Sequence, residues 1–589
     1  MLISIGSQNT ENTGTAAQYA HSGVNSARRH DLDALRAIAM LLGICLHAIA
    51  AYSGSLWVVM DSHQNEAFEK AVYFIHGFRM QLFFLVSGFF TALLTSRYGS
   101  FGMLGNRASR ILLPFLICVL TLIPSIKVLE FFALSATVSH PQEPIFRAIQ
   151  QGNVEVVLDL LEKGQPSVLE EKQKRLGLTP LTWAVLCESE QMVRLLLDRG
   201  ANPMATNRGG ENSLTFASML GRVDLLELLV KKGGDPLQPT ETGKLPWIAA
   251  HQSPEESSTM IWLARGKRPE DVTAFKQGRQ AVIEYLDQVY RSRGAIPSSS
   301  QKSALPEATP AMAKLPTFMQ RYFSWLASDN MVIKIGGLEL NLLQENSVDH
   351  LWFLWFLWWL CLIHAGLGWI RRIPGLRAFG NSIGLYPGLL VAVGLTACLQ
   401  AFMNLDYYPR SLNFVVGPDY SSGFIPKPHV IMYYAVFFFF GSWYFQIADH
   451  ECRLGKHWWV ALPAAVLVLF PLLFVVQGEL LQNCLLQTLY TWLMVVGAIG
   501  LAHRIFRTER KWFRYLADSS YWMYLIHVHL VICCQWVLYF WPLPALIKTA
   551  LVLIITISIL LVSYELFVRH TIIGRILNGK KPSRIPNKG

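Results

Sequence analysis

Two ionisable residues, Arg36 and His47, stand within one apolar stretch of the chain. Eleven positions separate them, close to three helical turns, so both side chains would face one side of a helix, roughly 16 Å apart along its axis. Gly43 lies between them and would leave space beside the histidine. Charge within a bilayer is costly and by default faces a polar cavity or a partner, and an imidazole exchanges protons near neutral pH. The pair therefore predicts a functional site, whereas either residue alone could be an interfacial arginine or a satisfied buried histidine.

A second apolar stretch, AVYFIHGFRMQLFFLVSGFFTALL, repeats this spacing. His76 and Ser87 are also eleven positions apart and share a helix face, with Arg79 close to it. Ser87 and Gly88 form a small polar notch where another helix could approach closely, and packing alone would explain the notch. Arg79 is harder to explain by packing, because an uncompensated guanidinium is expensive in a membrane.

Arg107 and Arg110 open a third apolar stretch one helical turn apart. Two guanidinium groups at this spacing can hold phosphate oxygens through paired hydrogen bonds. The alternative is that they are ordinary positive anchors at the membrane surface, which are common at such positions. The spacing alone favours the anchor.

Further histidines and tyrosines occur in two later apolar stretches. His350 opens one, and Tyr524, His527 and His529 lie together in another. Histidines two positions apart do not share a helix face, so His527 and His529 are a poor metal pair. The sequence has no CxxC, HExxH or GxGxxG motif, and it predicts neither a metal site nor a permanently bound cofactor.

The elements that must position these residues are membrane helices. Hydrophobic residues make up 52% of the 589 positions and charged residues 15%, which is typical of a polytopic membrane protein. Apolar stretches of spanning length predict an all-α bundle of about ten transmembrane helices. They occur at about 33–53, 71–95, 111–135, 351–370, 383–403, 430–447, 458–477, 482–502, 515–540 and 545–568.

Positive residues gather in alternate loops between these stretches, which predicts that both termini are cytoplasmic. Residues 1–30 read as a disordered tail and residues 571–589 as a basic one. The net charge of +11 needs no nucleic-acid partner, because much of the excess lies in these loops and the tail.

Residues 142–293 interrupt the membrane pattern with internal repeats. TPLTWA at 179–184 returns as NSLTFA at 212–217 and as LPWIAA at 245–250, each time after 33 positions. LLLDRGANP returns as LLVKKGGDP after the same interval. This period resembles ankyrin repeats, in which helix pairs stack on their neighbours. The pattern predicts a soluble α-solenoid with capping helices outside the cytoplasm, able to bind a protein partner, followed by a linker at 294–316.

The membrane stretches, taken in order, resemble the acyltransferase 3 family, and within it the glucan biosynthesis protein C-like branch. The resemblance covers about 31–137 and 345–570 and excludes the insert. It is carried by LDALRAIAMLLGICLH, FRMQLFFLVSGFF, RASRILLPF, HLWFLWFL, YYAVFFFFGSW and SSYWMYLIHVHL. Members are multi-pass inner-membrane enzymes that move an acyl group from cytoplasmic acyl-CoA to a carbohydrate hydroxyl across the bilayer.

The resemblance implies roles for individual residues. His47 would be the catalytic base or acyl relay, with Arg36 as its catalytic partner on the same helix face, and Arg107 and Arg110 would face the phosphates of CoA. Arg79, Ser87, Tyr524 and His527 match the family's motifs and would contact or support the substrate. Asp33, His76 and His350 are further candidates for the same supporting role. One departure is His529, which stands where the family usually has a proline. The insert is another departure.

Two other functions fit parts of the sequence. A non-enzymatic membrane receptor or scaffold would use the ankyrin repeats to bind a protein. A channel or transporter is disfavoured, because the sequence has no pore-loop signature and no evident repeat among its spans.

Overall fold

The computed structural model describes most of residues 29–578. The exceptions are 55–56, 165, 241–242, 244, 253, 266–269, 295–315, 327–331, 336–337, 342–347, 371–383, 404–415, 420, 477–479 and 509–510. The predicted tail at 1–30 and linker at 294–316 therefore lie almost wholly outside the described residues. The predicted basic tail is described only to residue 578, where it forms helix α26 (Ile572–Asn578).

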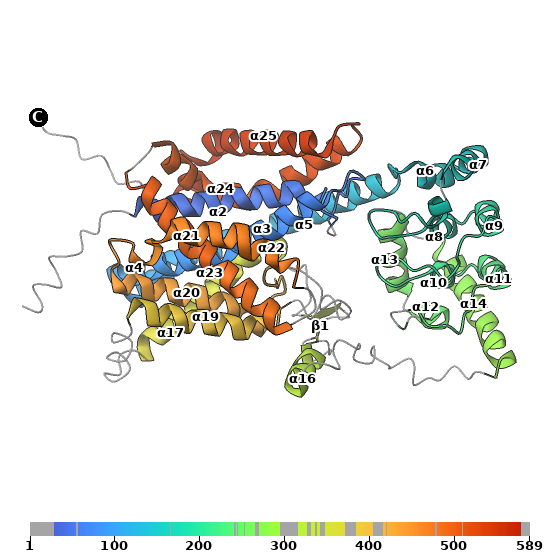
Figure 1. The fold of residues 1–589 in the computed structure, drawn as a ribbon, viewed down its shortest axis with the longest axis horizontal. Helices are drawn as coiled ribbons and strands as arrows, with labels where there is room; N and C mark the ends of the chain where they lie inside the picture. Colours follow the sequence, from blue (N-terminus) through green and yellow to red (C-terminus); the bar gives the residue numbers. More distant parts are fainter. Residues whose placement is uncertain are drawn as a thin grey trace, which may run out of the picture.

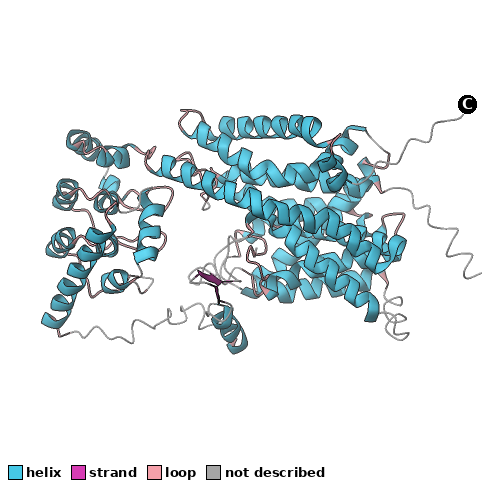
Figure 2. Cartoon of the chain, turned by 180° about the vertical axis from the view of Figure 1, so that it is seen from behind, coloured by secondary structure: helices cyan, strands magenta, loops and turns pink. Residues whose placement is uncertain are grey.

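A bundle of apolar helices forms the larger part of the molecule (Figures 1 and 2). Its elements are α2 (His30–Ala50), α3 (Glu66–His76), α4 (Arg79–Arg107), η1 (Ala108–Leu112), α5 (Leu113–Val138), η5 (Asp349–Leu351), α17 (Trp352–Ile370), α19 (Leu385–Gln400), α20 (Pro428–Ile447), η6 (Arg453–Gly455), α21 (Trp458–Pro463), η7 (Ala464–Leu469), α22 (Phe470–Leu473), α23 (Leu480–Ile505), α24 (Lys511–Tyr539), α25 (Ala545–Ser563) and η8 (Tyr564–Val568). The helical membrane fold predicted from the sequence is confirmed.

Every predicted apolar stretch contains helix. Seven helical stretches are long and apolar enough to cross a membrane, and one of them, Glu66–Val138, includes two of the predicted spans. The stretches at Leu385–Gln400 and Trp458–Leu473 are shorter apolar helices. The count of ten spans stays a prediction.

The centre of the bundle depends on close helix contact. A Cβ atom on Gly88 of α4 would overlap the backbone carbonyl of Phe438 in α20, and one on Gly441 would overlap the carbonyl of Leu85. Small residues on facing helices let two backbones approach and gain van der Waals contact where lipid offers no hydrophobic driving force. In the notch predicted at Ser87 and Gly88, the glycine therefore serves close packing against α20.

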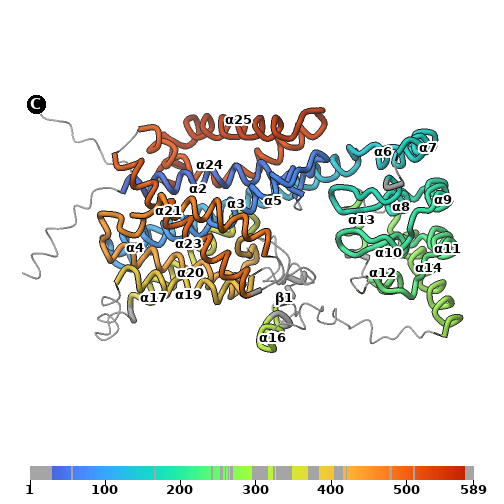
Figure 3. The backbone as a smooth tube through the Cα atoms, in the orientation of Figure 1, coloured from blue at the N-terminus to red at the C-terminus, as the bar shows by residue number. Residues whose placement is uncertain are grey.

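Helix α2 lies against α24 and α25, and Figure 3 traces the three as neighbours. Asp31 and Asp33 occupy its first turn and His47 its last, an order of charge that favours the helix dipole. Buried residues on α2 include Leu32, Leu35 and Ile44. The helix that carries Arg36 and His47 is thus held inside the bundle.

The insert is a stack of short helices beyond one end of the bundle (Figure 1). Its elements are α6 (Pro144–Gln150), α7 (Val154–Lys163), η2 (Pro166–Glu170), α8 (Pro180–Leu186), α9 (Glu190–Asp198), α10 (Ser213–Leu220), α11 (Val223–Lys231), α12 (Pro246–His251), α13 (Pro254–Arg265) and α14 (Val272–Ser292). Thr179 and Asn212 cap α8 and α10 at equivalent repeat positions. Such caps satisfy backbone N–H groups at the helix start.

A small substructure follows the insert. Helix α16 (Thr317–Leu326) precedes a two-stranded antiparallel hairpin of β1 (Val332–Ile335) and β2 (Leu338–Asn341), shown in magenta in Figure 2. Val332 pairs with Asn341 and Ile335 with Leu338. These two strands were not predicted from the sequence.

Candidate functional site

Arg36 and His47 both face α24, as the eleven-residue spacing predicts. The Arg36 guanidinium donates a hydrogen bond of 3.2 Å to the carbonyl of Ala517 and lies 3.9 Å from the Asp33 carboxylate. The ring of His47 lies 5.3 Å from that of His527, measured between centroids. One helix face therefore presents an arginine near one end of the bundle and a histidine near the other.

A cavity of about 140 Å³ opens beside Arg36. It is lined by Arg36, Met40, Phe83, Val86, Ser87, Phe90, Arg107, Arg110, Ile111, Phe353, Leu354, Leu357, Ala517, Ser520, Tyr521, Tyr524 and Leu577. Five predicted site residues are among them. The volume suits one small organic group or a cluster of waters.

Three arginines give this cavity its charge. Arg107 donates a 3.0 Å hydrogen bond to the Thr91 hydroxyl, and the Nε atoms of Arg36 and Arg107 are buried with no hydrogen-bond partner among the described residues. Arg110 also lines the cavity. Guanidinium groups with unused donors bind phosphate and carboxylate oxygens strongly, so the cavity favours an anion.

Tyr524 connects the cavity to a group of histidines. Its hydroxyl donates a 2.5 Å hydrogen bond to the His350 carbonyl, and its own carbonyl lies 2.8 Å from Nδ1 of His527. The His350 and His527 rings are 5.9 Å apart. Residues predicted on two separate stretches thus meet between the cavity and His47.

His47 has an unused ring nitrogen. Its Nδ1 atom is buried and has no hydrogen-bond partner in the described part of the chain. The Trp57 ring stacks on it with centroids 5.1 Å apart and an interplanar angle of 25°. The Gln535 amide donates to the His47 carbonyl at 2.9 Å, and its oxygen accepts a 2.7 Å bond from the Trp57 indole. An oriented imidazole whose Nδ1 atom is buried and free of a hydrogen bond within the described ranges can act as a base.

Arg79 lies beside the same face of α2. A Cβ atom on Gly43, one turn before His47, would overlap the Nη1 atom of Arg79. The Arg79 Nε atom is buried and has no hydrogen-bond partner among the described residues. Gly43 thus provides the space that the sequence predicted near His47, and the guanidinium of Arg79 occupies it.

His76 and His529 have other surroundings. His76 Nε2 lies 2.9 Å from the carbonyl of Pro418. His529, which replaces the expected proline, contacts the Ser125 hydroxyl on α5 at 2.9 Å. Helix α24 runs without interruption through this position. The described residues contain no group of three or more His, Cys, Asp or Glu that could hold a metal ion.

Sequence reasoning missed Trp57, Gln535 and a buried ion pair next to them. Lys548 of α25 lies 2.6 Å from Asp61, with side chains 0% and 2% exposed. Gln535 and Lys548 stand inside apolar stretches, and a polar residue there is itself a signal of function or pairing. Trp57 lies in a loop and offers no such signal.

An apolar helical bundle with an arginine-lined cavity, and with histidines grouped beside that cavity, defines a multi-pass membrane protein that has a site suited to an anion. The family described as an acyltransferase domain matches residues 29–142 and 315–567, more than half of the chain. The chain belongs to this acyltransferase 3 family. Ankyrin repeats in three copies match residues 141–240, so both resemblances drawn from the sequence are confirmed.

The chain is also similar to the glucans biosynthesis protein C of Escherichia coli K12 and of Escherichia coli O1:K1 / APEC. Each is 36% identical over 111 residues, which cover 19% of this chain and 28% of the relative. The match therefore spans less than a third of those proteins.

Proposed function

We propose that the chain is an O-acyltransferase that moves an acyl group from cytoplasmic acyl-CoA to a hydroxyl of an extracytoplasmic glucan or related glycan. The observation that carries the proposal is the succession of contacts from the arginine-lined cavity to His47: Tyr524 lines the cavity, its carbonyl contacts His527, and the His527 ring lies beside that of His47, whose Nδ1 atom has no hydrogen-bond partner among the described residues. Family membership and the similarity to glucans biosynthesis proteins support it.

The cavity suits the donor. Arg36, Arg107 and Arg110 would hold the phosphates of CoA by charge-assisted hydrogen bonds. The apolar side chains of Phe83 and Phe353 line the cavity and would contact the part of the acyl chain next to the thioester. The cavity is too small for the whole donor, so most of CoA would remain outside it at the cytoplasmic surface.

His47 would act as general base. The acceptor hydroxyl loses its proton to the imidazole as its oxygen attacks the thioester carbonyl, the new C–O bond forms, and the C–S bond breaks. The imidazolium then gives the proton to the departing thiolate, so CoA leaves as the thiol. An acyl group resting on His47 before transfer is an alternative course of the same reaction.

The neighbours of His47 change the role expected for Arg36. Arg36 lies in the cavity about three turns from the histidine, whereas Arg79 occupies the space at Gly43, one turn away. We therefore assign to Arg79 the stabilisation of charge that develops on the carbonyl oxygen. Arg36 would belong to donor binding.

The proposed setting is the inner membrane with both termini in the cytoplasm. In that orientation the cavity opens to the cytoplasm and the insert lies on the other side, next to the His47 end of α2. Protease protection of residues 142–293 in sealed right-side-out and inverted vesicles tests this orientation.

The reaction is tested with purified full-length protein in lipid nanodiscs, radiolabelled acetyl- or succinyl-CoA and a β-glucan acceptor. Base-labile label on the glucan is the product. We expect His47→Ala to abolish transfer and Arg107→Ala to raise the KM for the donor. His570→Ala is the matched control, because His570 has a 68% exposed side chain. Full transfer by His47→Ala would refute the proposal.

A further inference from the structure

The ankyrin insert contacts the loop that covers His47. Arg175 donates hydrogen bonds from Nη1 to the carbonyls of Val58 at 2.9 Å and Trp57 at 3.4 Å. Arg208 donates from Nη1 to the carbonyl of Gly54 at 3.0 Å. The two arginines are 33 positions apart, which is the repeat period. Equivalent positions in consecutive repeats thus bind consecutive parts of one loop.

These arginine contacts are suited to hold a loop. Charge-assisted hydrogen bonds are stronger than neutral ones, and backbone carbonyls persist whatever side chains the loop carries. Burial lowers the pKa of Arg175 to about 10, so the guanidinium still stays protonated at neutral pH. The Gln64 amide of the same loop donates to the Lys174 carbonyl at 3.3 Å.

The insert itself is fixed to the bundle. Leu134 and Val138 at the end of α5 belong to the same hydrophobic core as Phe146 of the first repeat. Helix α13 returns to α5, where the Trp262 ring stacks on that of Phe131 with centroids 5.3 Å apart and planes 9° apart. The repeat arginines therefore have a defined position relative to the membrane helices.

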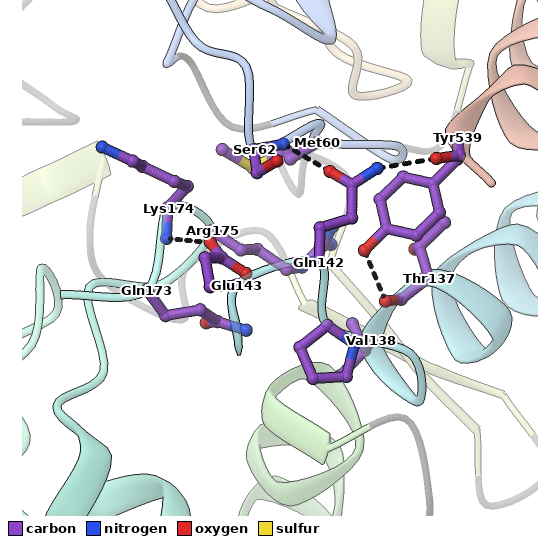
Figure 4. A pocket seen from close by; sticks show the side chains of 11 residues that line it. Met60, Ser62, Thr137, Val138, Gln142, Glu143, Gln173, Lys174, Arg175 and Tyr539 are labelled. Carbon is purple, nitrogen blue, oxygen red and sulfur yellow. Dashed lines mark hydrogen bonds between the residues drawn. The ribbon is translucent and has the colours of Figure 1, made fainter. Parts of the chain in front are cut away.

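The junction between insert and bundle is bridged by polar contacts (Figure 4). Gln142 accepts a 2.7 Å bond from the Ser62 backbone and donates a 2.6 Å bond to the carbonyl of Tyr539 at the end of α24. Glu143 accepts a bond from the Lys174 backbone at 3.2 Å. The start of the insert, the loop and the helix that carries His527 thus share one hydrogen-bonded junction.

We propose that Arg175 and Arg208 are positioning residues that hold Trp57 stacked against His47, so that the ankyrin insert sets the geometry of the acyl-transfer site. The occupant of this ankyrin surface is the chain's own loop after α2, through Gly54 and residues 57–64. The inference rests on the proposed function of His47. It adds Arg175 and Arg208, which lie in the insert, to the membrane-domain residues on which the transfer site depends.

The test uses the full-length protein in nanodiscs and two readouts. The first is kcat and KM for transfer. The second is the rate at which diethyl pyrocarbonate modifies His47, followed by mass spectrometry of its peptide, because the stacked indole covers the ring. The variants are Arg175→Ala with Arg208→Ala, and Trp57→Ala. Arg194→Ala is the control, since Arg194 is exposed on the same insert and pairs with Glu190.

We expect the double arginine variant to lower kcat by about 10-fold, because small displacements at a reacting centre have effects of this order. His47 should be modified several-fold faster, with the rate at exposed His570 unchanged as a measure of integrity. In a Trp57→Ala background the arginine changes should add nothing further to the loss of kcat, since coupled residues are not additive. Trp57→Phe should retain most activity.

Unchanged His47 modification in the double arginine variant would overturn the inference, and so would losses that simply add to those of Trp57→Ala. If either result is found and His47→Ala is inactive, the further inference fails and the proposed function still holds. If His47→Ala retains transfer, the proposed function itself fails.

Discussion

Gly43→Ala tests the role assigned to Arg79, because the added methyl group meets the end of this flexible side chain. The new Cβ would overlap the Arg79 Nη1 atom. An ordinary carbon–nitrogen contact requires the guanidinium to withdraw by about 1 Å. The helix itself meets no new backbone contact, so the change moves one charged group and leaves the packing of α2 intact.

The effect follows from that displacement. A shift of about 1 Å at a reacting centre can cost on the order of 100-fold in rate, equivalent to about 2.7 kcal/mol of transition-state stabilisation. Stability should move the other way, because alanine is about 1 kcal/mol better than glycine inside a helix. We therefore expect kcat to fall by 10- to 100-fold, as about 1.4 to 2.7 kcal/mol, with no loss in apparent Tm.

Gly88→Ala is the matched comparison. Its Cβ would overlap the backbone of Phe438, which cannot rotate away, so α4 and α20 must separate at a cost of about 1–3 kcal/mol. Apparent Tm in detergent at a fixed scan rate, and transfer of labelled acyl groups, are measured on both variants. A fully active Gly43→Ala, with Tm unchanged, would refute the role assigned to Arg79.

Three further outcomes are expected. Lys548→Met removes the buried cation that pairs with Asp61 and should destabilise the protein by about 3–5 kcal/mol, with Asp61→Asn in the same chain restoring much of the apparent Tm. Arg107→Ala removes a charge-assisted contact of about 1.5–3 kcal/mol and should raise the KM for acyl-CoA more than 10-fold. Although burial opposes it, the hydrogen bond from Arg265 holds the pKa of Glu188 below its usual range. Arg265→Gln should therefore speed amide exchange in the insert at neutral pH.

Each of these outcomes has a control. Arg569→Ala removes a half-exposed arginine paired with Glu565 and should leave the donor KM unchanged. The Arg265→Gln effect should fade as the pH falls through the lowered pKa of Glu188, because a carboxylate with a depressed pKa contributes stability only while ionised. An exchange difference that persists in acid, or a Lys548→Met protein as stable as wild type, would contradict the ion-pair reasoning.

Periodicity and burial cost explain what the sequence could predict. The 33-residue repeat determines where α8, α10 and α12 begin, because each repeat must stack on the next. The spacing of Arg36 and His47 predicts a common face, and the structure turns that face toward α24. Such inferences need only local geometry and the penalty for charge in a bilayer.

Contacts between distant segments were not predictable in the same way. The approach of Arg79 to Gly43 depends on how α4 packs against α2, and the stacking of Trp57 on His47 depends on a loop path. The prediction that Arg36 and His47 are catalytic partners rests on their helical spacing and on the family resemblance, and it stays a prediction. The tertiary packing brings the Arg79 guanidinium next to Gly43, one turn from His47, while Arg36 and Arg107 both line the cavity.

The position of the insert in the chain explains why its arginines reach the His47 loop. Helices α2, α4 and α5 cross the bundle in alternating directions, so the loop after α2 and the chain after α5 emerge at the same end. The insert therefore stands beside residues 51–54 and 57–65. Repeat units then offer equivalent side chains at regular intervals, and Arg175 and Arg208 use that regularity to bind Val58 and Gly54. The insertion point therefore gives a repeat domain access to the loop over His47, and the two arginines turn that proximity into a specific contact.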